Sequence, residues 1–574
     1  MPATATYKTP GVYVAEIPAF PPSVVGVATA IPVFVGYTER AEIAGKPVYF
    51  KPIPIGSLAD YEEVFGRGYR AVYNLEQVLP SSPDGVPDEY DFRVLDASGS
   101  PSGYMYYNLT AAPPVASPDE EETVAFALRA VAGEEPAPAQ PRFNLYNSLR
   151  LFYANGGGNG YVVSVGSYEG ATNGVEATPL LDGLTAASEQ VGPTMIVVPD
   201  AVLLLPTDKD TPWESQDFTE VATAMLQQAS SLGDRVAILD VYGSQYVNTS
   251  DYEEATLPAV IGAFQTAVGE TGLSYGMAYF PFLDTTVIPL SDVDYTNIND
   301  DTNINDDTGP LTQILELENT NLYNTPPVSP PSARYSMVQD LITDMATTPP
   351  DDRAAVTKLN NNLIAALPLL KEIELQVIGK NDVLPPSGAM AGVFTRVDAA
   401  NGVWNAPANV TLASVLKPTL RMDNAQQEDL NMPVNGKAVD VLRSFPGRGT
   451  VVWGARTLAG NSPDYRYIQV RRTLIYIEQS IKAALDPFVF APNTGQTWAT
   501  VVSMVSGFLQ GVWSQGGLMG ATPAEAFTVQ CGLGSTMTGT DVLNGYMIVQ
   551  VTLALIRPAE FIEVTFKQTM QGVG

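Results

Sequence analysis

The sequence predicts a protein of mixed α/β class that is built from several domains. Short apolar strands at 195–198, 236–241 and 275–280 alternate with helical patterns at 218–231 and 258–268. This alternation is typical of a parallel sheet covered by helices. The chain has 574 residues, of which 45% are hydrophobic and 16% charged. At one domain per roughly 150 residues, we expect about four folding units and a large buried core.

The first forty residues are extended and rich in proline. Prolines at this density exclude a helix, whereas the valine- and isoleucine-rich runs Val12–Ile17 and Val24–Val35 favour strands. The segment has little core of its own, so we expect it to lie on a neighbouring surface or to stay loose. It lacks the pattern of an export signal, so we expect synthesis and assembly in the cytoplasm.

The α/β core is predicted to span residues 26–45 and 150–440, with a last helix at Leu363–Ile378. An inserted domain interrupts it at 46–149. Within this insert, loops rich in proline and acidic residues surround short strands between 80 and 142. We expect this domain to face outward.

A second, acidic insert is predicted at 290–360. It contains the hexapeptide Asn-Ile-Asn-Asp-Asp-Thr twice in tandem, at 297–308. A calcium-binding loop would need glycine where Asn297 stands, and its third ligand position is also wrong. The repeat therefore predicts a solvated surface loop and no metal site.

The C-terminal unit is predicted to span residues 441–574. Apolar residues recur at helical spacing over 470–485, and a second helical pattern runs near Trp498–Trp513. Two strands follow, at Tyr546–Leu555 and Phe561–Phe566, each with alternating apolar residues. Three basic residues fall off the apolar stripe of the first helix: Arg471, Arg472 and Lys482.

The composition excludes several kinds of chemistry. The chain contains no histidine, which excludes a Ser-His-Asp triad and histidine metal ligands. Its single cysteine, Cys531, excludes an intrachain disulfide and a multi-cysteine metal centre, and we expect a buried structural thiol there. The net charge of −32 repels phosphate backbones and anionic lipid, so we expect no nucleic-acid partner and no membrane insertion.

Two glycine-rich motifs look catalytic but stand in the wrong context. Gly272–Gly276 matches G-x-S-x-G, yet a helical pattern precedes it, a strand follows, and no histidine is present. Gly156–Gly160 precedes a strand and lacks the lysine of a phosphate-binding loop. We therefore expect two tight turns, no catalytic residue and no cofactor.

Three stretches together resemble the contractile tail sheath proteins of phage tails, R-type pyocins and related injection systems. The N-terminal stretch contains T-P-G-V-Y-V at 9–14, V-G-V-A-T at 25–29 and F-V-G-Y-T at 34–38. The second contains P-P-S-G-A-M-A-G-V at 385–393 and runs on through G-V-W-N-A-P-A-N at 402–409. The third reads F-P-G-R-G-T-V-V-W-G-A-R-T-L at 445–458 and continues through Y-I-Q-V-R-R at 467–472 and R-P-A-E at 557–560.

The resemblance implies a subtilisin-like α/β core without protease activity, strand-rich inserts, a C-terminal α+β sheath domain and extended terminal arms. It also implies a mechanical function. Subunits stack as rings around an inner tube and contract from a metastable extended state, which drives the tube through a target envelope.

The partners that the resemblance implies are other copies of the chain, an inner tube protein, and baseplate and cap or terminator proteins. The particle would be a phage tail or a phage-tail-like particle. A capsid-like protein or an adhesin without contraction is the alternative. An enzyme is disfavoured because no set of residues in the sequence suggests one.

In this family, terminal arms tie neighbouring subunits together by adding strands to another subunit's sheet. We place the N-terminal arm at residues 1–25 and the C-terminal arm in the last strands. The proline-spaced N-terminal strands, which lack a local partner, are consistent with strand addition. The residues expected in these arms are Val12, Tyr13, Val14, Ile17, Met547, Val549, Val551, Ile562 and Val564.

Negative charge is concentrated outside the C-terminal unit. Residues 410–574 carry 11 acidic and 12 basic side chains, whereas the first 409 residues carry a net charge of −33. Our hypothesis is that the acidic part faces solvent at larger radius and that the C-terminal unit faces the tube. Arg471, Arg472 and Lys482 are candidate tube contacts, and a solvated helix face is the alternative.

Overall fold

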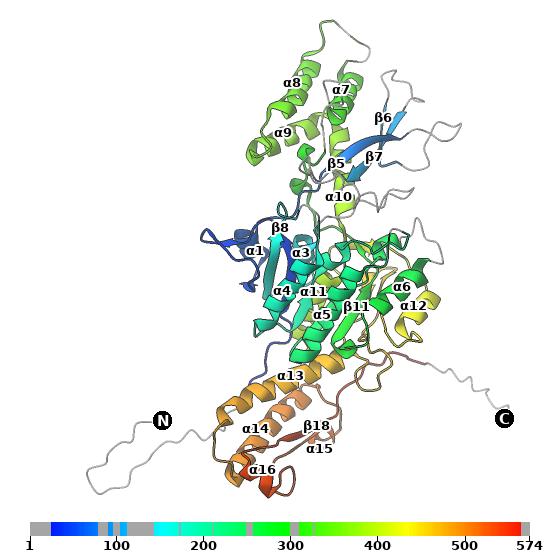
Figure 1. The fold of residues 1–574 in the computed structure, drawn as a ribbon. Helices are drawn as coiled ribbons and strands as arrows, with labels where there is room; N and C mark the ends of the chain where they lie inside the picture. The colour runs from blue at the N-terminus through cyan, green and yellow to red at the C-terminus, as the bar shows by residue number, and fades with distance from the viewer. Residues whose placement is uncertain are drawn as a thin grey trace, which may run out of the picture. The chain divides into compact units, whose positions relative to one another are not determined.

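The chain divides into two compact units, which are described separately. Unit 1 comprises residues 1–27 and 473–559, and unit 2 comprises residues 28–472 and 560–574. The computed structural model (Figure 1) describes residues 24–78, 90–95, 104–111, 143–171, 174–208, 210–247, 256–298, 309–324, 327 and 329–563.

An eight-stranded sheet forms the centre of unit 2 (Figure 1). Adjacent strands are parallel except at the two edges, where β16 and β4 run antiparallel to their neighbours. The parallel sheet predicted from the alternating pattern is confirmed. In spatial order the strands are β16 (Gly449–Val452), β15 (Asp440–Phe445), β11 (Gly276–Phe280), β10 (Val236–Asp240), β9 (Met195–Val197), β1 (Pro32–Thr38), β8 (Gly160–Ser167) and β4 (Ile53–Ile55).

Strand β1 lies in the middle of this sheet, between β8 and β9. All seven of its residues are buried. Its one proline, Pro32, stands at the first position, where a missing N–H is tolerated in a strand. Our expectation that the first forty residues have little core of their own is therefore wrong for Pro32–Thr38, because Val33 and Val35 pack into the main hydrophobic core of the sheet.

Helices cover both faces of the sheet. The face that carries Val33 and Val35 packs against α4 (Ala177–Glu189), α5 (Gln216–Leu232) and α6 (Thr256–Ala267). On the other face, the Phe34 ring lies 5.4 Å from that of Phe152 in α3 (Leu145–Ala154), which packs on α11 (Ser387–Asn401).

Two glycines of the motif at 385–393 allow α3 and α11 to approach closely. A Cβ at Gly388 would collide with the backbone of Ser148, and one at Gly392 would collide with the backbone of Phe152. Any larger residue would push the helices apart, so close helix packing accounts for this part of the motif.

A separate hydrophobic cluster in unit 2 joins segments that are far apart in sequence, and we call this part the lobe. It contains a three-stranded antiparallel sheet and four helices. These are β5 (Tyr73–Val78), β7 (Tyr104–Ala111), β6 (Phe92–Leu95), α7 (Pro310–Tyr323), α8 (Ala333–Thr347), α9 (Arg353–Ala366) and α10 (Pro368–Asn381).

The helix predicted at Leu363–Ile378 is wrong as a single element. Helix α9 ends at Ala366 and α10 begins at Pro368. Proline favours the first turn of a helix and breaks a helix interior, so Pro368 starts a new helix here.

The other elements of unit 2 connect these parts. They are β2 (Glu42–Ile43), β3 (Lys46–Pro47), α1 (Leu58–Phe65), β12 (Leu283–Thr285), β13 (Val383–Leu384), β14 (Val415–Pro418), α12 (Asn424–Asn431) and 3₁₀ turns at Pro199–Leu203, Ser244–Tyr246, Leu273–Tyr275, Leu290–Asp292 and Tyr295–Asn297. The turns at Gly272–Gly276 and before β8 stand where the sequence predicted them.

Unit 1 contains two long helices and a small sheet. Helix α13 (Ile468–Leu485) supplies its residues from 473 onward to this unit, and α14 (Gly495–Ser514) follows a 3₁₀ turn at Asp486–Phe488. The remaining elements are α15 (Pro523–Ala526), β17 (Phe527–Gln530), α16 (Gly539–Leu543) and β18 (Gln550–Leu553).

Three expectations for the C-terminal region need correction. The strand predicted at Tyr546–Leu555 is reduced to Gln550–Leu553, and residues 561–563 form no strand. Cys531 is partly exposed because it follows the end of β17, where it has left the sheet. Burial of the thiol raises its pKa.

Several predicted features lie outside the described residues. These are Val12, Tyr13, Val14, Ile17 and Val564, residues 299–308 of the tandem hexapeptide, and most of the loops at 80–142.

A buried carboxylic acid ends strand β10. Asp240 accepts hydrogen bonds from the backbone N–H and the hydroxyl of Ser387, at 2.7 and 2.5 Å. Burial raises the pKa of Asp240 to about 7, although both bonds act to lower it. Burial likewise raises the pKa values of Asp200, Glu318 and Glu374, to about 6, 7 and 7.

We expect the free energy of unfolding to fall as the pH rises from about 4 to about 7. In that window the folded chain holds protons that the unfolded chain, with an Asp pKa of about 3.9, has released. Asp240→Asn should flatten this fall by about 1–4 kcal/mol, leaving the contributions of the other acids whose pKa burial raises. Urea unfolding at a series of pH values measures the free energy of unfolding of both chains. The same dependence on pH in the variant as in the unaltered chain would contradict the prediction.

Candidate functional site at the roots of the terminal arms

The three motif stretches converge in unit 2 on two ion pairs, of which one is buried and the other is half-buried at its carboxylate. One holds the chain where the N-terminal segment enters the core, at Thr29, and the other holds Glu560, just before the C-terminal residues. We call these two places the arm roots. They define the candidate functional site, because at each of them a segment close to one end of the chain is tied to the core of unit 2 by an ion pair.

Arg472 forms the N-terminal arm root. Its guanidinium bonds both carboxylate oxygens of Asp398 in α11, at 2.6 and 2.8 Å, and the carbonyl of Thr29 at 2.9 Å. It also lies 4.6 Å from the centre of the Phe394 ring. The side chains of Arg472 and Asp398 are only 3% and 5% exposed. Each charge therefore depends on the other, because a buried ion without its partner is strongly unfavourable.

Glu560 forms the C-terminal arm root with Arg456. Their two hydrogen bonds, at 2.6 and 2.9 Å, make a bidentate pair. Asn431 and the Tyr467 hydroxyl donate further bonds to Glu560, at 2.8 and 3.0 Å. Burial acts to raise the pKa of Glu560, but Arg456 and these donors outweigh it and hold the pKa below its usual value. Glu560 is therefore held as a carboxylate.

A second acid lies beside the C-terminal arm root. Asp440 accepts the backbone N–H of Arg456 at 2.9 Å, and burial raises its pKa well above the usual range. A Cβ at Gly454 would collide with Asp440. The glycine in the motif W-G-A-R at 453–456 thus makes room for this carboxyl group.

The three candidate tube contacts occupy different environments. Arg471 and Arg472 are buried, whereas Lys482 is exposed. Arg471 donates to the Ser274 hydroxyl at 2.8 Å and lies between the rings of Tyr275 and Tyr465, at 4.2 and 3.9 Å. The solvated helix face that we weighed is therefore wrong for the two arginines, because each is held by partners within the chain. Whether any of the three contacts a tube stays a prediction.

In unit 1, Gly26 and Val27 lie against α13. The backbone N–H of Val27 donates to the Ser480 hydroxyl at 3.1 Å. Gly26 lies so close to the Tyr476 ring that a side chain would not fit there. The glycine of the motif V-G-V-A-T at 25–29 is thus required by close contact with the helix.

The small sheet of unit 1 has two strands, β17 and β18. Residues 518–519 bridge one end of β18, at Leu555 and Ala554, and the described part of the chain places no strand beside β17 on its other edge. Of the predicted arm residues, Met547, Val549 and Val551 are half-buried and Ile562 is exposed. The predicted alternation is confirmed around β18, because Ile548, Gln550 and Thr552 are exposed.

Exposed apolar side chains on unit 1 were missed by sequence reasoning. Phe490 is fully exposed and its backbone has φ +65°, a conformation that is uncommon for a bulky residue. The only indication of their exposure in the sequence is that they stand near proline or glycine. This indication is weak, because many apolar residues beside proline or glycine are buried. The group comprises Val489, Phe490, Met519, Leu533, Leu543 and Tyr546.

Metal-ligand groups and membrane-spanning helices are both absent from the described residues. In the part of the chain that the structure describes, no three acidic or cysteine side chains are grouped as metal ligands would be. Among those same residues, no helix combines the length and the apolar character needed to span a bilayer.

Comparison with known proteins finds similarity to tail sheath proteins, as the motifs predict. Residues 347–458 match the family model described as phage tail sheath protein central domain, and residues 461–569 match the phage tail sheath C-terminal domain. The tail sheath protein of Burkholderia phage BcepMu is 31% identical over 141 residues, which is 24% of this chain. The matched stretch spans 29% of the length of that relative.

Two solved structures share the fold over nearly the whole chain. The sheath of the extracellular contractile injection system PVC, in its contracted state, is 23% identical with a TM-score of 0.53, and the match covers 99% of each chain. The contracted helical sheath of the anti-feeding prophage is 24% identical with a TM-score of 0.52, covering 98% of this chain and 100% of the other.

The fold is therefore that of contractile sheath subunits, with a large mixed sheet and added domains. The resemblance recognised in the sequence is confirmed, since residues 347–458 and 461–569 match the central and C-terminal domain models of phage tail sheath proteins.

Proposed function

We propose that the chain is the structural subunit of a contractile sheath, which polymerises around an inner tube and shortens to drive the tube through a target envelope. The observation that carries this proposal is the convergence of the tail sheath motifs on the two arm roots, where each terminal segment is fixed by an ion pair with a buried arginine. A linker under tension needs such fixed points, because force on an unanchored segment would unfold it.

The two-stranded sheet of unit 1 is the acceptor in this proposal. A two-stranded sheet alone is marginally stable, and an edge strand presents unpaired N–H and C=O groups. The N-terminal arm of a second copy, with Val12, Tyr13, Val14 and Ile17, adds a strand at β17. The C-terminal residues around Ile562 extend toward a further copy.

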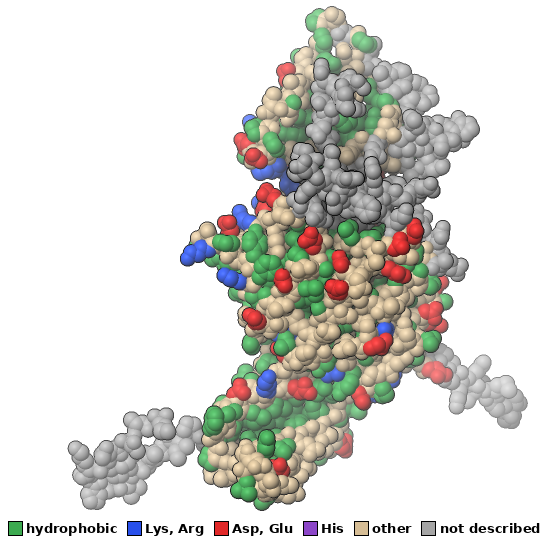
Figure 2. All heavy atoms as spheres, in the orientation of Figure 1, with side chains coloured by type: hydrophobic (Ala, Val, Ile, Leu, Met, Phe, Trp, Pro, Cys, Tyr) green, Lys and Arg blue, Asp and Glu red, His purple; other side chains and the backbone are tan. Residues whose placement is uncertain are grey.

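The charge distribution supports a radial arrangement. Acidic side chains are spread over the part of unit 2 around α5 (Figure 2), and they keep neighbouring sheaths from associating laterally. The C-terminal unit, with its near-neutral charge, faces the tube, and the exposed Phe490 and Lys482 are the side chains best able to contact another chain. A tube that contacts residues 80–142 instead would contradict this arrangement.

The partners in this proposal are further copies of the chain, an inner tube protein, and baseplate and cap or terminator proteins. After synthesis and assembly in the cytoplasm, the chain becomes part of a phage tail or a phage-tail-like particle. It acts without catalysis.

We expect Ser274→Ala to leave sheath assembly and contraction intact. The Ser274 hydroxyl accepts a hydrogen bond from Arg471, so its loss should cost about 1–2 kcal/mol of stability and nothing in function. Urea unfolding and electron microscopy of assembled particles measure the two effects. Ester or peptide hydrolysis that disappears in this variant would contradict the structural role.

Electron microscopy of the purified full chain, together with analytical sedimentation, tests the proposed function. The expected result is concentration-dependent polymers with a regular axial repeat. A strictly monomeric chain under all conditions of salt and concentration, also with the tube protein present, would contradict it.

A further inference from the structure

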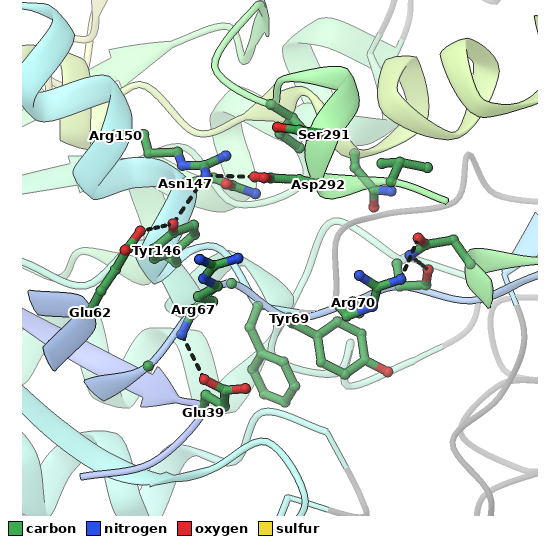
Figure 3. Close-up of a pocket in the computed structure, with 18 of the residues that line it drawn as sticks. Glu39, Glu62, Arg67, Tyr69, Arg70, Tyr146, Asn147, Arg150, Ser291 and Asp292 are labelled. Carbon is green, nitrogen blue, oxygen red and sulfur yellow. Dashed lines mark hydrogen bonds and ion pairs between the residues drawn. The ribbon is translucent and has the colours of Figure 1, made fainter. Parts of the chain in front are cut away.

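A cavity of about 740 Å³ lies in unit 2 between the lobe and the part built on the eight-stranded sheet, which we call the sheet domain. Cavities of this size hold small molecules in many proteins, where the usual range is about 300–1,000 Å³. Its walls come from the end of α1, the following segment at 66–71, α3, and the turn that contains Ser291 and Asp292 (Figure 3). Both halves of unit 2 therefore contribute to it.

Arginine is concentrated at this cavity. Arg40, Arg67, Arg70, Arg150 and Arg353 line it, although the whole chain has only 30 basic residues and a net charge of −32. Further Lys and Arg side chains gather at the left side of unit 2 in Figure 2. So many cations at one place in an acidic protein need an explanation.

Three of the five arginines are neutralised within the chain. Arg150 pairs with Asp292 at 2.5 Å, and Arg70 pairs with Asp294 at 2.9 Å. Arg353 also pairs with Asp294. These three side chains occupy the carboxylates of Asp292, which lines the cavity, and of Asp294 next to it.

Two nearby carboxylates are occupied by other donors. Glu39 accepts the backbone N–H of Arg67 at 2.7 Å, and Glu62 accepts the Tyr146 hydroxyl at 2.6 Å (Figure 3). Glu63 stands on the rim and is exposed to water. None of the three forms an ion pair with an arginine of the cavity in the described part of the chain.

Two guanidinium groups are left without a carboxylate partner among the described residues. The Arg40 guanidinium donates only to the carbonyls of Glu62 and Glu63 among the described residues, at 3.3 and 3.4 Å. The Arg67 guanidinium makes no hydrogen bond to a described residue, and Figure 3 shows it extending away from Glu39 toward Asn147. The side chains of Asn147 and Ser291 are likewise without a hydrogen-bond partner in the described ranges.

We propose that this cavity binds a small polyanion that carries two or more phosphate or carboxylate groups. Arg67 and Arg40 receive the anionic groups, because the planar guanidinium matches the oxygens of phosphate and carboxylate. Asn147 and Ser291 donate to its remaining oxygens. Since both halves of unit 2 line the cavity, the bound ligand holds the lobe against the sheet domain.

Titration calorimetry of the folded full chain with tripolyphosphate and, in a second series, with citrate tests this proposal. We expect saturable binding at one site per subunit for at least one probe, a rise in the melting temperature with ligand, and weaker binding as salt increases. The two probes separate phosphate from carboxylate chemistry. No saturable binding of either probe at millimolar concentration would overturn the proposal.

Arg67→Ala is the decisive variant, because the Arg67 side chain holds no other part of the structure. It should weaken binding about tenfold or more while leaving the melting temperature without ligand unchanged. Arg67→Lys keeps the positive charge but loses the planar, two-pronged guanidinium. Its affinity for the probe should therefore lie between those of the unaltered chain and of Arg67→Ala. Arg421→Ala, an exposed arginine away from the cavity, is the matched control. Equal affinity in the Arg67 and Arg421 variants would overturn the site.

Discussion

Asp398→Ala is expected to destabilise the subunit by about 3–5 kcal/mol. The substitution leaves Arg472 charged and buried, with only the Thr29 carbonyl among its hydrogen-bond partners at this arm root. The loss should appear as a lower midpoint in urea unfolding. It should also free the N-terminal segment, so that proteolysis near residue 29 becomes faster than in the unaltered chain.

Two further variants separate the ion pair from general effects of substitution. Asp340→Ala, at an exposed aspartate on α8, should change stability by no more than about 0.5 kcal/mol. The double variant Arg472→Met with Asp398→Leu removes both charges and should recover most of the loss, since no buried ion is left unpaired. If Asp398→Ala lowers the stability no more than Asp340→Ala does, the ion pair at the N-terminal arm root does not hold the N-terminal segment as we propose.

Deletion of residues 1–20 is expected to abolish sheath formation and to leave a folded, soluble monomer. The described residues begin after this segment, and among them Gly26 and Val27 are the first to contact α13. The truncated chain should therefore unfold thermally at nearly the temperature of the full chain. Sedimentation and circular dichroism measure the two properties.

A peptide of residues 1–20 provides the matched control. It should bind the truncated monomer, because the acceptor sheet at β17 is intact, and a peptide with Val12 and Val14 replaced by proline should not, since proline lacks the N–H that strand pairing requires. Normal tubes formed by the truncated chain would rule out arm exchange. An aggregated truncation would instead place the arm in the subunit's own core.

Sequence reasoning predicted the parallel sheet well because buried strands and amphipathic helices leave strong local patterns. The helix predicted at 218–231 is α5, and the strand predicted at 236–241 is β10. It failed where one residue decides the outcome, as at Pro368, which divides an apparently continuous helical pattern. Strand ends were also overestimated, because the alternating pattern favours a strand from Tyr546 whereas β18 begins only at Gln550.

The arm roots were recognisable only in part. The motifs contain Arg456, Arg472 and Glu560, but nothing in the spacing indicates that Glu560 pairs with Arg456, 104 residues earlier. Arg471 and Arg472 looked exposed because helical periodicity places them off the apolar stripe. Their burial depends on tertiary partners such as Asp398, which a one-dimensional pattern cannot reveal.

Electron cryo-microscopy of the assembled particle, before and after triggered contraction, tests the central claim most directly. The account predicts two helical lattices of the same subunit, one longer and narrower and one shorter and wider. In both, the N-terminal arm of one copy should pair with the β17–β18 sheet of another, while the Arg472–Asp398 and Arg456–Glu560 pairs stay intact. A single lattice that never shortens, or arms that fold back onto their own subunit, would contradict it.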